Sequence, residues 1–285
     1  MEYLAALHPA ALYALVVVLG LLVGSFLNVV ILRFPAALIH DWKCQCRELL
    51  GLEGEPDAAP ANIANGRSRC PSCGCPIAWY DNIPVVSWLV LRGRCRNCDG
   101  TISARYPIVE LATAILSVIV IWRLGPETAG LTGLLLTWML IAATGIDLDH
   151  QLLPDQLTLP LVWLGLFLNI FGIFTDLESA VIGAIAGYLA LWLVFHLFRL
   201  VTGKEGMGYG DFKLLAAIGA WFGWQVLPTV ILLASGVGAV TGLALIALRR
   251  MGREVPIAFG PFLAAAGWLV LVGGDVIVDF WIPLL

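Results

Sequence analysis

Carboxylate side chains lie at the ends of apolar stretches in this chain. At two of these positions, glycines precede the carboxylate in the sequence. Asp147 closes one stretch within Gly145-Ile146-Asp147-Leu148-Asp149-His150, and Asp211 follows Gly206, Gly208 and Gly210 where another begins. Ionisable groups at such positions are costly and are usually functional or paired. Two carboxylates brought together share a proton, so one can activate water while the other protonates a polarised amide. The pattern is compatible with peptide hydrolysis by acid and base.

Other roles for these carboxylates are also compatible with the residues. Asp155 follows Pro154 where a helix is expected to begin, which is a common capping position, and Asp211 has a similar place. The run from Asp147 through Asp149 to His150 also resembles a divalent-metal cluster of a transporter. Asp149 and Asp155 both compete with Asp147 as the partner of Asp211. From the residue types alone, these alternatives stay open.

Cysteine pairs predict a metal site. All seven cysteines lie between Cys44 and Cys98, and four of them form two C-x2-C turns. Two such turns supply the four thiolates that structural Zn²⁺ prefers in tetrahedral geometry. The predicted ligands are Cys70, Cys73, Cys95 and Cys98. Cys75 is read as a spare thiol, and Cys44 and Cys46 as possible ligands of a second or alternative site.

The elements that must position these residues are apolar helices. The 285 residues are 60% hydrophobic and 13% charged, with a mean hydropathy of +0.91, which excludes an ordinary soluble domain. A bilayer core needs roughly 20 apolar residues per helix. About eight such stretches occur, at 11–32, 105–122, 129–146, 157–174, 179–198, 212–224, 226–248 and 257–275. The predicted fold class is an all-α polytopic membrane protein.

Basic residues predict the orientation of these helices, because basic loops stay in the cytosol. With eight spans, all of the 16 Lys and Arg residues except Arg123 fall on one side. This side carries the loop between the first two spans, so the cysteines are expected in the cytosol and the N-terminus in the periplasm. The formal charge of −4 gives no indication of nucleic-acid binding. The lipid bilayer is the expected partner, and no oligomeric state is indicated.

These boundaries predict three parts. The first transmembrane helix covers 1–32, a cysteine-rich, zinc-ribbon-like cytosolic domain covers 33–104, and a transmembrane peptidase domain covers 105–285. The first half of the cytosolic part, through Gly51, Gly54, Pro56, Pro60 and Gly66, has turn-forming composition and is expected to be irregular.

Several strings, taken in order, resemble those of the type IV prepilin leader peptidases. They cover nearly the whole chain: Gly24-Ser25-Phe26-Leu27-Asn28, the paired C-x2-C turns, Trp79-Tyr80-Asp81-Asn82-Ile83-Pro84, Ile102-Ser103-Ala104-Arg105-Tyr106-Pro107 through Glu110, Asp147 with Leu153-Pro154-Asp155, and Gly208-Tyr209-Gly210-Asp211-Phe212-Lys213.

The resemblance implies a bifunctional enzyme of the bacterial inner membrane. Such an aspartic endopeptidase removes the short basic leader of type IV prepilins and pseudopilins at the cytosolic face. It then acts as an N-methyltransferase on the new N-terminal residue, using S-adenosylmethionine, in type IV pilus or type II secretion systems. The catalytic pair carries over to Asp147 and Asp211. The cofactor site has no clear motif, and Glu48, Arg94 and Glu110 are weak candidates for it.

Overall fold

The computed structural model describes residues 8–52, 59–60, 66–204, 206–248 and 257–281, with side chains up to Gly274. The chain forms two compact units, Glu2–Ile119 and Val120–Leu285, which divide within one helix. The basic residues Arg249, Arg250 and Arg253 lie outside the described residues, as does the N-terminus, which is predicted to be periplasmic. The three predicted domains stay a prediction.

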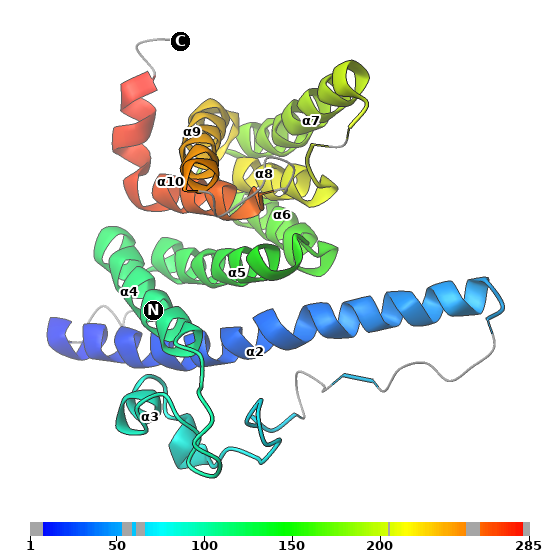
Figure 1. Cartoon of the computed structure of the whole chain (residues 1–285). Coiled ribbons are helices and arrows are strands. Elements are labelled where there is room, and N and C mark those ends of the chain that lie inside the picture. The colour runs from blue at the N-terminus through cyan, green and yellow to red at the C-terminus, as the bar shows by residue number, and fades with distance from the viewer. Residues whose placement is uncertain (1–7, 53–58, 61–65, 205, 249–256, 282–285) are drawn as a thin grey trace. The chain divides into compact units, whose positions relative to one another are not determined.

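The described residues are helical, with only isolated β-bridges (Figure 1). Eight helices lie at the eight predicted apolar stretches: α2 (Pro9–Leu49), α4 (Arg105–Leu124), α5 (Thr128–His150), α6 (Asp155–Asn169), α7 (Leu177–Thr202), α8 (Tyr209–Phe222), α9 (Leu227–Ala247) and α10 (Gly260–Trp281). A short helix, α3 (Val86–Val90), follows a 3₁₀ turn at Trp79–Asn82. The predicted all-α polytopic class is confirmed.

Helix α2 continues beyond its predicted end at residue 32. The expectation of irregular structure was wrong for residues 33–49, which extend the helix to Leu49 in spite of Pro35. Apolar character ends near Arg33, but the residues from Ala36 onward are mostly good helix formers. Loss of hydrophobicity therefore marked the expected edge of the bilayer and not the end of the helix. Cys44 and Cys46 both lie on this extension.

In the unit Val120–Leu285, α8 is the central helix. It packs against α6, α7, α9 and α10 and is buried from Asp211 to Trp221 except at Lys213 (Figure 1). Glycines permit the closest approach: a Cβ on Gly219 of α8 would lie 2.1 Å from the carbonyl oxygen of Gly183 of α7. Close backbone contact between small residues is a common way for membrane helices to associate.

Polar groups fasten the far end of α8 to α6. The Trp221 indole donates to the carbonyl of Leu161 at 2.9 Å. The amide of Asn169 donates to the carbonyls of Ala220 and Trp221, which would otherwise lack partners at the helix end. Helix α8 is held by hydrogen bonds at this end and packs closely against α7 at Gly219. These contacts fix the position of its first turn.

In the unit Glu2–Ile119, α2 and α4 pack through small residues. A Cβ on Gly20 would lie 2.6 Å from the Cα of Ala114, and one on Gly24 would lie 2.6 Å from the Cα of Glu110. Asn28 also joins the two helices, since its side chain donates to the carbonyl of Tyr106 at 3.1 Å. Gly24 and Asn28 thus have structural roles that bring Glu110 close to α2.

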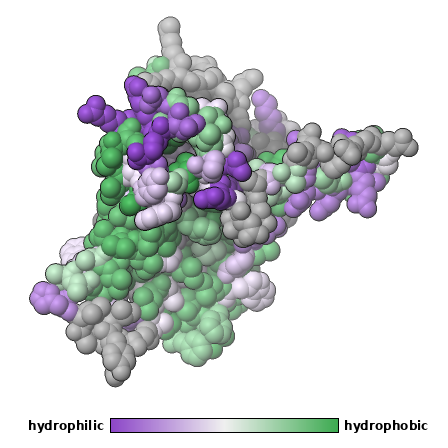
Figure 2. Space-filling view, turned by 90° about the horizontal axis from the view of Figure 1, so that it is seen from below, coloured by the Kyte–Doolittle hydropathy of each residue, from purple (hydrophilic) through white to green (hydrophobic). Residues whose placement is uncertain are grey.

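The surfaces of the long helices are largely apolar. Within the part of the chain that the structure describes, five helical segments are long and apolar enough to cross a membrane: α2, α4, α5, α7 and Trp224–Ala247. Figure 2 shows broad hydrophobic areas on the face in view, with hydrophilic side chains gathered in patches. Helices α6 and α8, of 15 and 14 residues, span only about 20 Å at about 1.5 Å per residue. They are shorter than a bilayer core and rely on their neighbours.

Candidate active site

Asp147 lies in the last turn of α5, with only 5% of its surface exposed. The helix ends three residues later at His150, because Gln151 adopts a left-handed conformation and donates its backbone N–H to the Asp147 carbonyl at 2.8 Å. The carboxylate Oδ2 accepts a hydrogen bond of 2.9 Å from the backbone N–H of Gly260, where α10 begins. The carboxylate is therefore held by a backbone group from a distant helix.

Asp211 lies in the first turn of α8 and is 6% exposed. The glycines before it are not required by an unusual backbone conformation, since Gly206, Gly208 and Gly210 are not among the positive-φ residues. Gly210 is required by close approach, because a Cβ there would lie 2.5 Å from the Cβ of Leu153. This contact places the start of α8 against the segment that joins α5 to α6.

The two buried carboxylates are near neighbours. The charge of Asp147 acts directly on the carboxyl group of Asp211, although 64 residues separate them in sequence. Two buried carboxylates that are brought together can share one proton. The arrangement provides one proton acceptor and one proton donor side by side.

The two rival carboxylates have different surroundings. Asp149 is exposed on α5, and residues two apart on a helix do not share a face. Asp155, in the first turn of α6, is half exposed and forms an ion pair with Lys213 of α8. Both alternatives are thus at the surface, whereas Asp147 is buried with Asp211. The choice of catalytic pair stays a prediction that this geometry supports.

The four predicted metal ligands come together. The thiol sulfurs of Cys70, Cys73, Cys95 and Cys98 all lie within 4.8 Å of one another. Within the described residues, this is the one group of three or more Cys, His, Asp or Glu side chains able to hold a metal ion. The alternative cluster of Asp147, Asp149 and His150 does not form such a group. A four-thiolate set suits structural Zn²⁺. Cys44 and Cys46 are not part of the group.

The two cysteine turns have the same backbone pattern. In the first, the N–H of Cys70 donates to the Cys75 carbonyl and Gly74 has positive φ. In the second, 25 residues later, Cys95 donates to Gly100 and Asp99 has positive φ. A hydrogen bond from the Cys75 N–H lowers the pKa of Cys73 to about 6, which favours the metal-binding thiolate. Cys75 itself contacts the Asn97 amide at 3.2 Å.

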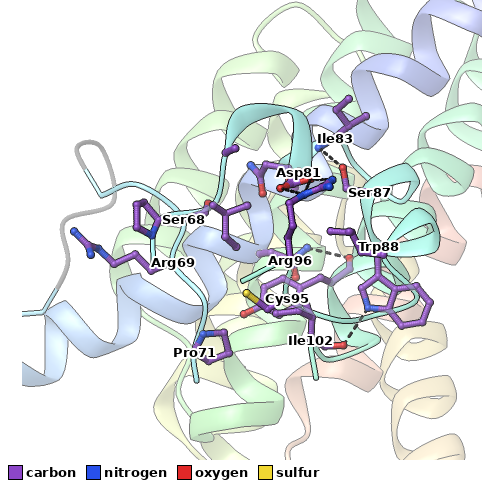
Figure 3. Close-up of a pocket in the computed structure, with 18 of the residues that line it drawn as sticks. Ser68, Arg69, Pro71, Asp81, Ile83, Ser87, Trp88, Cys95, Arg96 and Ile102 are labelled. Atoms are coloured by element: carbon purple, nitrogen blue, oxygen red, sulfur yellow. Dashed lines mark hydrogen bonds and ion pairs between the residues drawn. The ribbon is translucent and has the colours of Figure 1, made fainter. Parts of the chain in front are cut away.

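A cavity of about 960 Å³ lies in the same unit, beside the cysteine turns (Figure 3). The hydrogen bonds drawn in Figure 3 shape its walls: Trp88 donates to the carbonyl of Ile102, and Arg96 forms an ion pair with Asp81 at 2.6 Å. The bond from Arg96 lowers the pKa of Asp81 and keeps it charged. The volume is within the range of cofactor sites.

The three weak cofactor candidates do not all lie at one site in the structure. Arg94 and Glu110 line the cavity, together with Ser25 and Asn28 of the first helix. Glu48 is exposed near the end of α2 and does not line it. Two of the three candidates thus share one cavity, although their cofactor role stays a prediction.

Comparison with known proteins gives the family. Residues 18–124 match the bacterial peptidase A24 N-terminal domain, and residues 134–243 match the type IV leader peptidase family. A protein of Pseudomonas aeruginosa named prepilin leader peptidase/N-methyltransferase is 55% identical, over 96% of this chain and 94% of its own length. The chain belongs to the type IV leader peptidase family.

Relatives in other bacteria carry the same name. Those of Stutzerimonas stutzeri and Aeromonas hydrophila are 56% and 55% identical, each over 96% of this chain and over 94% and 95% of their own lengths. No solved structure matches the chain. The predicted family is confirmed, and both aspartates lie within the residues that match the type IV leader peptidase family model.

The sequence alone did not indicate Gly260 as part of the site. Its contribution is a backbone N–H, which every residue except proline carries, so no side chain marks the position. The available signal was Gly260-Pro261 at the start of the last apolar stretch, since proline is favoured in the first turn of a helix. That signal predicts a helix start but not what the start touches.

Proposed function

We propose that this chain removes the basic leader of type IV prepilins and related pseudopilins with Asp147 and Asp211, and then methylates the new N-terminus with S-adenosylmethionine. The predicted enzyme class, peptidase and N-methyltransferase, is confirmed by the family models and by the names of the relatives. The observation that carries the residue assignment is the burial of two interacting carboxylates, one from α5 and one from α8.

The peptidase step uses the shared proton of the pair. The ionised carboxylate takes a proton from water as the water oxygen attacks the scissile carbonyl, and the protonated carboxyl group stabilises the oxygen that becomes negative. The C–N bond then breaks and the departing amine receives a proton from the pair. Both carboxylates return to their starting state, so neither a covalent intermediate nor a metal ion enters the cycle.

The cleavage site is placed at the cytosolic face of the inner membrane, with the N-terminus periplasmic. The distribution of basic residues supports this orientation, because only Arg123 of the 16 falls on the opposite side. A prepilin has a basic leader and an apolar helix, so its scissile bond lies where the bilayer meets the cytosol. Asp147 and Asp211 both stand at the ends of helices that such a boundary would meet.

Methyl transfer is assigned to the cavity beside the cysteine turns. S-adenosylmethionine supplies an electrophilic methyl group on a positively charged sulfur. Arg94 and Glu110 line the cavity and offer opposite charges to a zwitterionic ligand, and the cavity is large enough for a ligand of this class. The four cysteines would hold Zn²⁺ and stabilise the fold around the cavity, since a closed four-thiolate shell leaves no position for substrate.

The catalytic pair is tested by single substitutions in the purified enzyme. Asp147→Asn and Asp211→Asn should each lower the rate of prepilin cleavage by about 10²- to 10⁴-fold, the usual contribution of acid–base groups. Mass spectrometry of the product measures cleavage and methylation separately. Asp149→Asn is the matched control and should cleave normally. Normal cleavage by either of the first two variants, or loss in the control alone, would overturn the assignment.

A further inference from the structure

The feature that goes furthest beyond the proposed function is the carboxylate of Glu110. It belongs to the second turn of α4, is 7% exposed and lines the cavity. Its Oε2 accepts a hydrogen bond of 2.7 Å from the backbone N–H of Val85, and Ser25 of α2 lines the same cavity. A glutamate side chain that is this buried is uncommon unless it is paired.

The carboxylate is held firmly in place. Val85, which it binds, has a φ of 62°, a conformation that β-branched residues rarely adopt. Such strain persists only where the surroundings enforce it and is concentrated at functional sites. On the other side, Gly24 of α2 packs directly against the Glu110 backbone. The position of the carboxylate is therefore set by α2, α4 and the start of α3 together.

The charges around the cavity leave Glu110 without a cation. The other acidic side chain of the lining, Asp81, is neutralised by Arg96. Arg33 donates to the carbonyls of Gly66 and Arg67. Among the described residues, no Lys, Arg or His forms an ion pair with Glu110. A buried carboxylate that lacks a countercharge has a high free energy, so it favours the binding of a ligand cation.

We propose that Glu110 binds the positive centre of the methyl-transfer reaction. This inference rests on the proposed methyltransferase function. In that reaction, the lone pair of the neutral amine forms the new N–CH₃ bond, the S–CH₃ bond breaks and its electron pair stays on sulfur. The positive charge thus passes from sulfur to nitrogen, and the extra proton leaves to solvent. A fixed carboxylate stabilises this charge at either atom, so it serves the donor sulfonium or the acceptor ammonium.

The experiment compares charged and neutral forms of the donor. Calorimetry on the full-length protein in nanodiscs would measure Kd for S-adenosylmethionine, which carries the sulfonium charge, and for S-adenosylhomocysteine, which does not. If Glu110 faces the sulfonium, Glu110→Gln weakens binding of S-adenosylmethionine by about tenfold or more and leaves S-adenosylhomocysteine unchanged, as expected for a charged hydrogen bond or ion pair. Glu110→Asp, which keeps the charge, should restore part of this difference.

The second part of the experiment tests whether Glu110 binds the acceptor amine. If Glu110 faces the ammonium, Glu110→Gln leaves both nucleoside affinities unchanged and raises KM for a leader-free peptide in the methylation assay by a similar factor. Equal weakening of both nucleosides, or no change in nucleosides and peptide, would overturn the proposal. Normal prepilin cleavage and normal metal content show that the variant is folded. Glu48→Gln, an exposed glutamate outside the cavity, is the matched control.

The wild-type protein separates this inference from the proposed function. Wild-type binding of S-adenosylmethionine, weakened by Arg94→Ala, supports the cavity as the methyl-donor site whatever Glu110 does. If the wild-type protein bound neither nucleoside, the proposed cofactor site would be wrong, and the role of Glu110 would fall with it.

Discussion

At the scale of single residues, the proposed peptidase site depends on a glycine that has no catalytic group. The backbone N–H of Gly260 fixes Oδ2 of Asp147, and a Cβ on Gly260 would lie 2.6 Å from that same oxygen. Glycine is therefore the residue that allows both the hydrogen bond and the space for the carboxylate. Gly260 is a positioning residue, because it acts on the substrate only through Asp147.

Gly260→Ala should displace the Asp147 carboxylate without preventing substrate binding. We expect kcat for leader cleavage to fall by about 10- to 100-fold, the loss that follows from disturbing one hydrogen bond to a charged group, while KM stays the same. Steady-state kinetics on a prepilin substrate measure both constants. Gly274→Ala is the control on the same helix, since a Cβ there meets nothing within 4 Å. A parallel rise of KM would instead indicate a general distortion.

At this scale, sequence reasoning finds side chains better than it finds backbone contacts. The four cysteines stood out because repeated C-x2-C turns are unusual, and Asp147 and Asp211 were candidates because carboxylates at span ends are costly. The resemblance, and not the residue types, chose Asp147 over Asp149 and Asp155. Gly260 and the strained Val85 did not stand out, because their roles depend on neighbours that are distant in sequence. Glu110 was found only as a weak candidate, since burial and missing countercharges become visible only when the cavity is assembled.

At the scale of helices, the proposed active site depends on how closely α7 and α8 pack. Gly183 and Gly219 face each other, and a Cβ on either would lie within 2.4 Å of the carbonyl oxygen of the other. Unlike a flexible side chain, a helix backbone cannot move aside locally. A larger residue must therefore shift α8 as a whole, and Asp211 with it.

Gly219→Ala should lower the free energy of unfolding by about 1–3 kcal/mol, as overpacking of a tight contact usually does, and should reduce leader cleavage. Thermal unfolding in detergent and a cleavage assay test the two effects. Gly236→Ala on α9 is the control, because a Cβ there meets nothing within 4 Å and alanine favours helix formation. Equal stability of the two variants would contradict this account of the α7–α8 contact.

The helices themselves were predictable, and their limits were less so. Apolar stretches of about 20 residues identify membrane helices because lipid allows few alternatives. All eight helices of 14 residues or more in the described part of the chain coincide with such stretches. The extension of α2 to Leu49 was missed because hydropathy indicates only whether a helix lies in lipid or in water. The helix propensity of the residues decides where the helix ends.

At the scale of the whole molecule, the two proposed activities belong to separate compact units. The cysteine turns and the cavity lie in Glu2–Ile119, whereas Asp147, Asp211 and Gly260 lie in Val120–Leu285. Damage that is confined to the metal site should therefore affect the two reactions differently.

Cys70→Ser should remove one thiolate of the metal set, lower bound metal and reduce methylation, while most of the leader cleavage remains. Metal analysis and mass spectrometry of the product measure the three quantities. Cys46→Ser, on the extension of α2 and outside the group, should change none of them. Removal of the metal from the wild-type protein by a chelator should reproduce the effect of Cys70→Ser. If both activities were lost together, the metal would support the whole fold.

The hydrogen bond from Gly260 to Asp147 also has a consequence for biosynthesis. Asp147 and Asp211 leave the ribosome before Gly260 does, and the stretch from Asp211 to Gly260 takes about 2 to 10 s at about 5–20 residues per second. During that interval both carboxylates exist, but the amide that holds one of them has not yet been translated. Without this hydrogen bond, we expect a nascent chain to cleave about 10- to 100-fold more slowly than the complete enzyme until α10 is inserted.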